Sequence, residues 1–301
     1  MRNLWEPNIQ RGWRIGLLLA ALLLITAGGL LFAVTQILIS LWTFLMSLGA
    51  VLAILLLIWV GLHLWNLVHA AYEMDRNAIT IYWGLSQHQI PMASVREVFS
   101  GEKVSGLSMR PGLRWPGYFV GDGEAEDLGP ILFYATAPLE DLVIIRTGSM
   151  SYAISPEDLE EFLTAFRERM EMGPTQEVAE ASTHPGFLDW WIWQDRMAWG
   201  PLAISLGSLV LLLGVICWRY PALPSEIVMR FGPEGEPLLV TGEARIFYLG
   251  LMGGAFLLLN GGLGLFLYQR VRVAAYFLWS GLLMLEGGVW AALLTILLNQ
   301  P

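Results

Sequence analysis

Residues 15–65 read IGLLLAALLLITAGGLLFAVTQILISLWTFLMSLGAVLAILLLIWVGLHLW, an apolar run that is almost unbroken. One membrane span needs about 20 apolar residues, so this run has room for two helices. A single helix of about fifty residues would overshoot any bilayer at a rise of about 1.5 Å per residue. Polar side chains gather near the middle of the run, at Thr35, Gln36 and Ser40. We therefore predict two membrane-spanning helices joined by a tight turn near residues 35–40.

Composition supports further membrane spans. The chain has 301 residues, of which 55% are hydrophobic and only 14% are charged. A soluble domain usually carries about 25% charged residues, so the deficit indicates a membrane protein. Three more apolar runs follow, at residues 200–218, 246–268 and 273–298. The last two are joined only by residues 269–272, which predicts a helical hairpin, and we expect about five transmembrane helices in total.

Arginine positions predict the orientation of the spans. Cytoplasmic loops of membrane proteins carry an excess of Lys and Arg. If the chain crosses five times, one side of the membrane receives Arg2, Arg11, Arg14, Arg76, Arg196, Arg270 and Arg272. The other side receives Arg219, Arg230 and Arg245, which weakens the bias without reversing it. We expect a bacterial inner-membrane protein whose N-terminus and central segment are cytoplasmic and whose C-terminus is extracytoplasmic.

The segment between the second and third spans has the pattern of short strands followed by one helix. Runs rich in β-branched and aromatic residues occur at 78–84, 86–91, 94–99, 117–121, 130–136, 142–147 and 150–155. A helix is then predicted by SPEDLEEFLTAFRERM, with Ser155 as its N-cap and Pro156 in its first position. Its apolar face consists of Leu159, Phe162, Leu163 and Phe166. We predict a small β-barrel or sandwich closed by this C-terminal helix.

Three passages of this segment occur in an order that is typical of one family. They are the QIP passage that runs from Gln89 to Val95, the glycine loop Gly112–Gly121 (GLRWPGYFVG) and the closing passage Phe133–Phe162. Together they resemble the bacterial pleckstrin-homology-like (PH) domains. The resemblance implies an inserted PH-like domain at residues 73–171.

The charge of this domain indicates what it binds. Phosphoinositide-binding members of the wider fold use Lys or Arg in the first hairpin, but here that hairpin reads WGLSQHQ, residues 83–89. Residues 73–196 hold 9 basic and 20 acidic side chains, so anionic head groups are repelled from most of this surface. We therefore expect protein partners, with neither a phosphoinositide nor a nucleic acid as ligand.

One loop of the domain carries a small basic cluster. Lys103, Arg110 and Arg114 occur within it, and Trp115 follows directly. These four residues form either a ligand- or partner-contact loop or a loop that lies on the membrane surface or on another span. The acidic run at residues 122–127 has carboxylates at alternate positions and suits either a hard cation or a solvated turn. We favour the turn, because the bidentate Glu that closes a calcium loop is missing.

A linker is predicted after the domain. Residues 173–186, GPTQEVAEASTHPG, are polar and read as a flexible connection. Four tryptophans follow just before the third span, at Trp190, Trp191, Trp193 and Trp199. Tryptophan favours the head-group interface, so we expect a short interfacial anchor. The expected parts are an N-terminal transmembrane hairpin (1–72), the PH-like domain (73–171), the linker with its Trp-rich interfacial segment (172–198) and a three-helix transmembrane domain (199–301).

The loop between the third and fourth spans, residues 219–245, is expected outside the cell. Its sequence YPALPSEIVMRFGPEGEPLLVTG, residues 220–242, predicts a turn, a strand near 228–231 and a reversal at 232–235. The pattern resembles a bacterial membrane domain of unknown function that often lies beside toxin-immunity membrane proteins. The histidine of that family is Arg230 here and its closing acid is Leu238, which puts any function of those positions in doubt.

Two polar residues lie inside predicted spans. Asn260 is about ten residues before the turn at residues 269–272, and Glu286 is about fourteen after it, so their depths differ by roughly 6 Å. A carboxylate in a membrane span is costly and by default indicates function. Glu286 is therefore either a proton or ion site, or a structural group that hydrogen-bonds Asn260 or a backbone carbonyl.

Enzyme motifs are not found. The sequence has no HExxH, GxSxG, phosphate-loop or dinucleotide pattern, and Cys217 is its one cysteine. We expect no cofactor, no metal site and no catalysis. The favoured function is a non-catalytic membrane-anchored adaptor or regulatory protein whose domain contacts protein partners or a second copy. The alternative is a transport- or immunity-type protein with a polar site at Glu286 and Asn260, and an enzyme acting on lipids through the Lys103–Arg114 loop ranks third.

Overall fold

The computed structural model describes residues 3–103, 108–109, 114–125, 128–183, 192, 195–233 and 236–299. The chain forms two compact units. One comprises residues 1–25 and 53–188, and the other comprises residues 26–52 and 189–301. Each unit is described by itself below.

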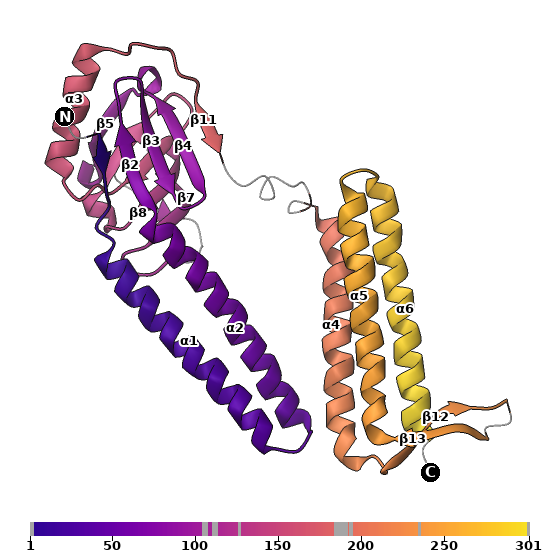
Figure 1. The fold of residues 1–301 in the computed structure, drawn as a ribbon. Helices are drawn as coiled ribbons and strands as arrows, with labels where there is room; N and C mark the ends of the chain where they lie inside the picture. Colours follow the sequence, from indigo (N-terminus) through magenta and orange to yellow (C-terminus); the bar gives the residue numbers. More distant parts are fainter. Residues whose placement is uncertain are drawn as a thin grey trace. The chain divides into compact units, whose positions relative to one another are not determined.

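The long helices confirm the predicted spans. They are α1 (Gln10–Gln36), α2 (Leu41–Val68), α4 (Arg196–Arg219), α5 (Phe247–Tyr268) and α6 (Arg272–Leu298) (Figure 1). Within the described residues, 5 helices are long and apolar enough to cross a membrane. The tight turn lies where Ser40 precedes α2, and the Thr43 hydroxyl accepts a hydrogen bond from the Ser40 amide at 2.8 Å. The protein is therefore a multi-pass membrane protein.

The region between α2 and α4 is rich in β-structure, as predicted, and its strands form two sheets. The first sheet has the order β1 (Leu4–Trp5), β2 (Ala70–Met74), β3 (Ala78–Trp83), β4 (Ser86–Pro91) and β11 (Ala181–Thr183). The second has the order β5 (Glu97–Ser100), β9 (Val143–Arg146), β10 (Ser151–Ile154), β8 (Gly129–Ala135), β7 (Phe119–Ala125) and β6 (Ser108–Met109). Neighbouring strands are antiparallel except β10 and β8.

The first sheet begins before the membrane hairpin. Strand β1 precedes α1, and strand β2 follows α2, yet the two pair with Leu4 opposite Glu73 and Trp5 opposite Tyr72. Two residues carry too little periodicity for a strand to be predicted, so β1 was missed. The pairing places residues 3–9 in the β-domain instead of in the hairpin domain that we expected at residues 1–72.

Helix α3 (Leu159–Met172) follows β10, and its start differs from the prediction. Asp158 is its N-cap, and the Asp158 carboxylate accepts a hydrogen bond from the Glu161 amide at 2.9 Å. Ser155 is buried, and its hydroxyl instead accepts a hydrogen bond from the Thr136 amide at 2.7 Å. The prediction of Ser155 as N-cap was wrong because Asp158 caps equally well and tertiary contacts occupy the serine.

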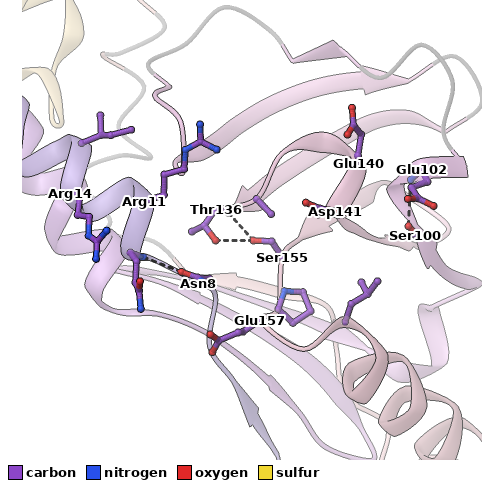
Figure 2. A pocket seen from close by; sticks show the side chains of 15 residues that line it. Asn8, Arg11, Arg14, Ser100, Glu102, Thr136, Glu140, Asp141, Ser155 and Glu157 are labelled. Carbon is purple, nitrogen blue, oxygen red and sulfur yellow. Dashed lines mark hydrogen bonds between the residues drawn. The ribbon is translucent and has the colours of Figure 1, made fainter.

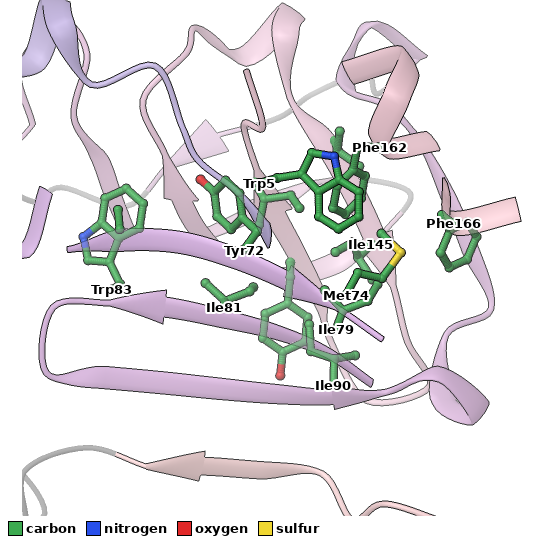
Figure 3. Packing of buried hydrophobic residues seen from close by; sticks show 14 of the residues in the cluster. Trp5, Tyr72, Met74, Ile79, Ile81, Trp83, Ile90, Ile145, Phe162 and Phe166 are labelled. Carbon is green, nitrogen blue, oxygen red and sulfur yellow. The ribbon is translucent and has the colours of Figure 1, made fainter. Parts of the chain in front are cut away.

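The core of the β-domain joins both sheets to α3. Trp5 is 1% exposed, and its indole meets the Phe162 ring edge-on with centroids 5.4 Å apart (Figure 3). Phe162 was predicted on the buried face of α3, and it is buried. The same cluster contains Tyr72 from the first sheet and Ile145 from the second. Burial of these large apolar side chains is the main force that holds the N-terminal segment to the domain.

The segment predicted as a flexible linker is partly held on the domain. Its residues 181–183 form β11, which pairs with β4 through Ser182 opposite His88. The Asn77 side-chain oxygen accepts hydrogen bonds from the amides of Thr175 at 2.8 Å and Gln176 at 3.0 Å. Polar composition indicated a free chain, but backbone groups at an open sheet edge favour a further strand.

The second unit contains α4, α5, α6 and a β-hairpin. The hairpin consists of β12 (Glu226–Phe231) and β13 (Pro237–Gly242), which confirms the strand and reversal predicted in the loop between spans. The buried glycines of α5 allow close packing, since a Cβ at Gly264 would collide with the Trp279 indole of α6. This agrees with the role expected for small residues between membrane helices.

Candidate functional site

One hollow of the β-domain lies where α1 begins. It has a volume of about 880 Å³. The lining residues are Asn8, Gln10, Arg11, Arg14, Ile15, Ser100, Glu102, Thr136, Ala137, Glu140, Asp141, Ser155, Pro156, Glu157 and Leu159 (Figure 2). We call this hollow the junction cavity. It joins residues that are more than a hundred positions apart in the sequence.

One wall of the junction cavity is basic. Arg11 and Arg14 lie in the first turns of α1, three residues apart, so they share one helix face. Both side chains are exposed. In the described part of the chain, neither guanidinium makes an ion pair. Their hydrogen-bond donors are therefore open to a ligand.

The opposite wall is acidic. Glu102 belongs to η2 (Gly101–Lys103), and Glu140 and Asp141 belong to η3 (Leu139–Asp141). The two short helices are tied together because the Gly101 amide donates to the Leu142 carbonyl at 2.7 Å. With Glu157, the lining holds 4 carboxylates against 2 guanidinium groups. The cavity thus separates charges of opposite sign on different elements.

The part of the lining between these walls is polar and rigid. The hydroxyl groups of Thr136 and Ser155 lie 3.2 Å apart, and both residues are buried. The Ser155 amide donates to the Tyr72 hydroxyl at 3.3 Å, and that hydroxyl donates to the Tyr134 carbonyl at 2.7 Å. Buried groups whose partners are all in place hold a fixed geometry.

A smaller hollow of about 380 Å³ lies beside the junction cavity. Arg11 and Thr136 line both hollows, and Arg114 lines the smaller one. The Trp115 indole nitrogen donates to the Gly12 carbonyl at 2.9 Å, and its ring stacks on Tyr118 with centroids 4.5 Å apart. The predicted contact loop therefore packs on the start of α1, with Trp115 buried and Arg114 exposed.

The rest of the predicted basic loop is only partly described. Arg110 lies outside the described residues, and the side chain of Lys103 is not described. In the acidic run, Asp122 and Glu124 are exposed on β7, and residues 126–127 lie outside the described part. Within the described residues, no group of three or more His, Cys, Asp and Glu side chains is placed to hold a metal ion.

A polar network centred on the buried His88 of the β-domain was not anticipated from the sequence. The Tyr134 hydroxyl lies 2.7 Å from His88 Nε2, and the Ser182 hydroxyl lies 3.0 Å from His88 Nδ1. Burial raises the pKa of Tyr134 to about 12, and the charges of Asp122 and Tyr118 add to the rise. Tyr134 is thus neutral at physiological pH. Through His88, which lies between the Tyr134 and Ser182 hydroxyls, this chain of contacts connects β8 to β4 and β11, so we assign it a structural role.

In the second unit, the predicted polar pair is not hydrogen-bonded. The Asn260 side-chain amide donates to the Phe256 carbonyl of its own helix at 3.0 Å. Glu286 is 5% exposed, and within the described residues neither carboxylate oxygen makes a well-formed hydrogen bond. The side chains of Ser205 and Ser208 of α4 are its weak hydrogen-bonding neighbours. The expected contact fails because an Asn in a helix reaches the carbonyl one turn back more easily than a neighbouring helix.

A second polar cluster marks the start of α4. Asp195 is the N-cap of α4 and accepts hydrogen bonds from the phenols of Tyr276 and, at 2.7 Å, Tyr268. These hydrogen bonds lower the pKa of the Asp195 carboxyl. Of the predicted interfacial tryptophans, Trp199 lies exposed on α4, and Trp190, Trp191 and Trp193 lie outside the described residues.

Comparison with known families supports the resemblance seen in the sequence. Residues 70–170 match a family model described as bacterial PH domain. The match covers all three passages from which the resemblance was drawn, and it starts at β2 instead of at residue 73. No curated protein and no solved structure matches the chain. The match ends before α4, so the resemblance of the C-terminal part to a toxin-associated membrane domain stays a prediction.

Proposed function

We propose that this protein is a non-catalytic, membrane-anchored adaptor or regulatory protein whose PH-like domain contacts protein partners. The observation that carries the proposal is the pairing of β1 with β2, which makes both ends of the α1–α2 hairpin strands of one sheet. The bacterial PH match at residues 70–170 supports a binding module, since this fold is generally non-catalytic. A domain built onto two membrane helices is suited to holding a partner at the membrane.

Two further contacts support this rigid attachment. Trp5 is inserted in the core, and the Trp115 indole donates to the Gly12 carbonyl at 2.9 Å. A domain on a flexible tether searches a large volume, whereas a fixed domain presents one surface at one height above the bilayer. We interpret the two sheets with α3 as a PH-like sandwich closed by its C-terminal helix.

The outer face of α3 offers a surface for a basic partner. A hollow of about 460 Å³ lies along it, lined by Trp5, Asp158, Glu160, Glu161, Thr164, Ala165, Glu168 and Arg169. Glu160, Thr164 and Glu168 follow each other at intervals of four and share one exposed face. The matched residues 70–170 carry 8 basic and 15 acidic side chains, so the domain as a whole favours a positively charged partner.

The arginine bias favours a cytoplasmic position for this domain in a bacterial cell. In this orientation the β12–β13 hairpin and the C-terminus lie outside the inner membrane. The partner would then be another protein with a basic cytoplasmic segment, or a second copy of this chain.

Crosslinking in native membranes, followed by purification in mild detergent and mass spectrometry, tests the proposal. We expect one protein in stoichiometric amount, and its recovery should fall at least fivefold in the double variant Glu160→Lys/Glu168→Lys. Glu97→Lys/Glu124→Lys is the matched control, because both residues are exposed acids of the second sheet. Reproducible recovery of the protein alone and monomeric, or equal loss in both double variants, would contradict the adaptor function.

A second candidate function rests on Glu286. Inside a membrane bundle, a buried carboxylate that makes no well-formed hydrogen bond among the described residues favours a proton or ion site, as in transport-type proteins. This candidate predicts that Glu286→Gln removes proton or cation movement through the protein in sealed liposomes. Unchanged ion movement in that variant, or none in the wild type, would remove its support.

A further inference from the structure

We propose that the junction cavity binds the head group of a zwitterionic phospholipid. The phosphate would lie against Arg11 and Arg14, and the ammonium group would lie against the carboxylates of Glu140 and Asp141. This inference is independent of the protein-contact function proposed above, which concerns the outer face of α3.

The charge of the lining selects this class of ligand. Two guanidinium groups that make no ion pair with any described residue suit a phosphate, for which arginine offers several parallel donors. A purely anionic head group, however, would face 4 carboxylates against 2 guanidinium groups. A head group that carries both a phosphate and an ammonium is attracted to both walls, so the excess of acid favours it over an anionic lipid.

The arrangement of the walls matches a ligand with separated charges. Arg11 and Arg14 project from α1, whereas Glu140, Asp141 and Glu102 come from the short helices of the β-domain (Figure 2). Thr136 and Ser155 lie between the two groups in the same view. Hydroxyl groups there can donate to ester or phosphate oxygens, which are acceptors only.

The cavity lies at the end of a candidate membrane span, and this position favours a lipid over a soluble metabolite as its ligand. Arg11 and Arg14 belong to the first turns of a candidate span, Gln10–Gln36, and the apolar run begins at Ile15, which also lines the cavity. Arginines at such a position lie at the level of the head groups. Leu159 adds apolar lining from the side of α3.

The size of the cavity is also adequate. Sites for small molecules have volumes of about 300–1,000 Å³, and the junction cavity has about 880 Å³. The buried hydrogen bond from the Thr136 amide to the Ser155 hydroxyl, at 2.7 Å, keeps its wall in place without a ligand. The cavity wall is therefore pre-organised, so binding a ligand loses less conformational entropy there.

The test uses the full chain in mild detergent with defined lipids and native mass spectrometry. Phosphatidylethanolamine is the zwitterionic probe, and phosphatidylglycerol is the anionic probe. We expect retained phosphatidylethanolamine to exceed phosphatidylglycerol about tenfold at equal lipid concentration. Arg11→Gln/Arg14→Gln should lower retention of both lipids about tenfold, and the single variant Arg14→Gln gives the same direction if the double variant does not fold.

The acidic wall gives the sharper test. Glu140→Gln/Asp141→Asn should lower retention of phosphatidylethanolamine several-fold and leave phosphatidylglycerol unchanged or increased. Arg270→Gln/Arg272→Gln is the control for general loss of arginines near the membrane, since Arg270 lies in the turn between α5 and α6 and Arg272 begins α6. The control should retain lipid as the wild type does.

Three outcomes would overturn the proposal. One is equal retention of both lipids with no effect of Glu140→Gln/Asp141→Asn, which would indicate simple attraction of anions to arginine. Another is equal loss in the Arg270→Gln/Arg272→Gln control, which would indicate lipids bound around the whole protein. The last is displacement of the lipid by an equal concentration of glycerophosphoethanolamine, which would indicate a soluble phosphodiester as the ligand.

Discussion

The indole nitrogen of Trp115 donates a hydrogen bond of 2.9 Å to the carbonyl oxygen of Gly12. Trp115 belongs to a loop of the β-domain, and Gly12 lies in the first turn of α1. The carbonyl near a helix start normally accepts from within the helix, so the indole acts as a second donor. This contact links the domain to the membrane hairpin at a second place, besides the pairing of β1 with β2.

The loop and α1 approach so closely at this contact that Gly117 cannot be replaced by a larger residue without strain. Gly117 has a φ of 91°, and a Cβ there would collide with the backbone of Gly12. Gly117→Ala should lower the thermal unfolding temperature of the β-domain, because it adds backbone strain of about 1–3 kcal/mol and a clash between loop and helix. Gly121→Ala is the control, since Gly121 also has a positive φ, 139°, but open space around it. An equal effect of both variants would contradict a role for the close approach.

Trp5 should be needed for the stability of the domain. It is 1% exposed in the core, so Trp5→Ala should destabilise the β-domain by about 3–5 kcal/mol. Limited proteolysis of the full chain in detergent measures the effect as faster cleavage between residues 70 and 170. Leu4→Ala is the control, because the Leu4 side chain is 45% exposed and should change cleavage little. Equal resistance of Trp5→Ala and the wild type would show that β1 is dispensable.

Tyr134 should make the domain sensitive to alkaline pH. Burial raises its pKa from 10.0 to about 12 in the folded domain, so its stabilising effect is complete below pH 10. As the pH rises from 10 to 12, the unfolded chain releases the phenol proton first, and this stability is lost at about 1.4 kcal/mol per pH unit. The difference in free energy of unfolding between the wild type and Tyr134→Phe should therefore shrink over this range. A constant difference would contradict the raised pKa.

Glu286 should lower the stability of the helix bundle. A buried polar group that lacks a well-formed hydrogen bond costs up to about 1–3 kcal/mol, so Glu286→Leu should raise the thermal unfolding temperature of the second unit. Asn260→Leu is the control, because the Asn260 amide already donates to the Phe256 carbonyl. If Glu286→Leu destabilised the bundle more than Asn260→Leu, the carboxylate would have a structural partner. Stabilisation together with lost ion movement in Glu286→Gln would support the second candidate function.

Local patterns in the sequence were enough to predict the long helices and the turns that follow them. The polar residues between the first two spans predicted the turn before Ser40, and the Pro- and Gly-rich loop predicted strand β12 and the chain reversal after it, though not strand β13. The passages around Gln89, Gly112 and Phe133 indicated a PH domain that the family match then supported. These features depend on neighbours in the chain, which is why periodicity and turn residues reveal them.

Only the tertiary structure shows which sequence-distant segments pair as strands or line the same cavity. Leu4–Trp5 and Ala181–Thr183 become strands only because edges of the first sheet are open to them. The junction cavity unites Arg11 and Arg14 with the carboxylates of Glu140 and Asp141, more than a hundred residues away, and no local pattern reports such a pairing. The membrane character of this protein and the PH-domain resemblance of residues 70–170 thus follow from apolar runs and short motifs. Its anchoring and its charged cavity follow from long-range burial and strand pairing, whose partners depend on the whole fold.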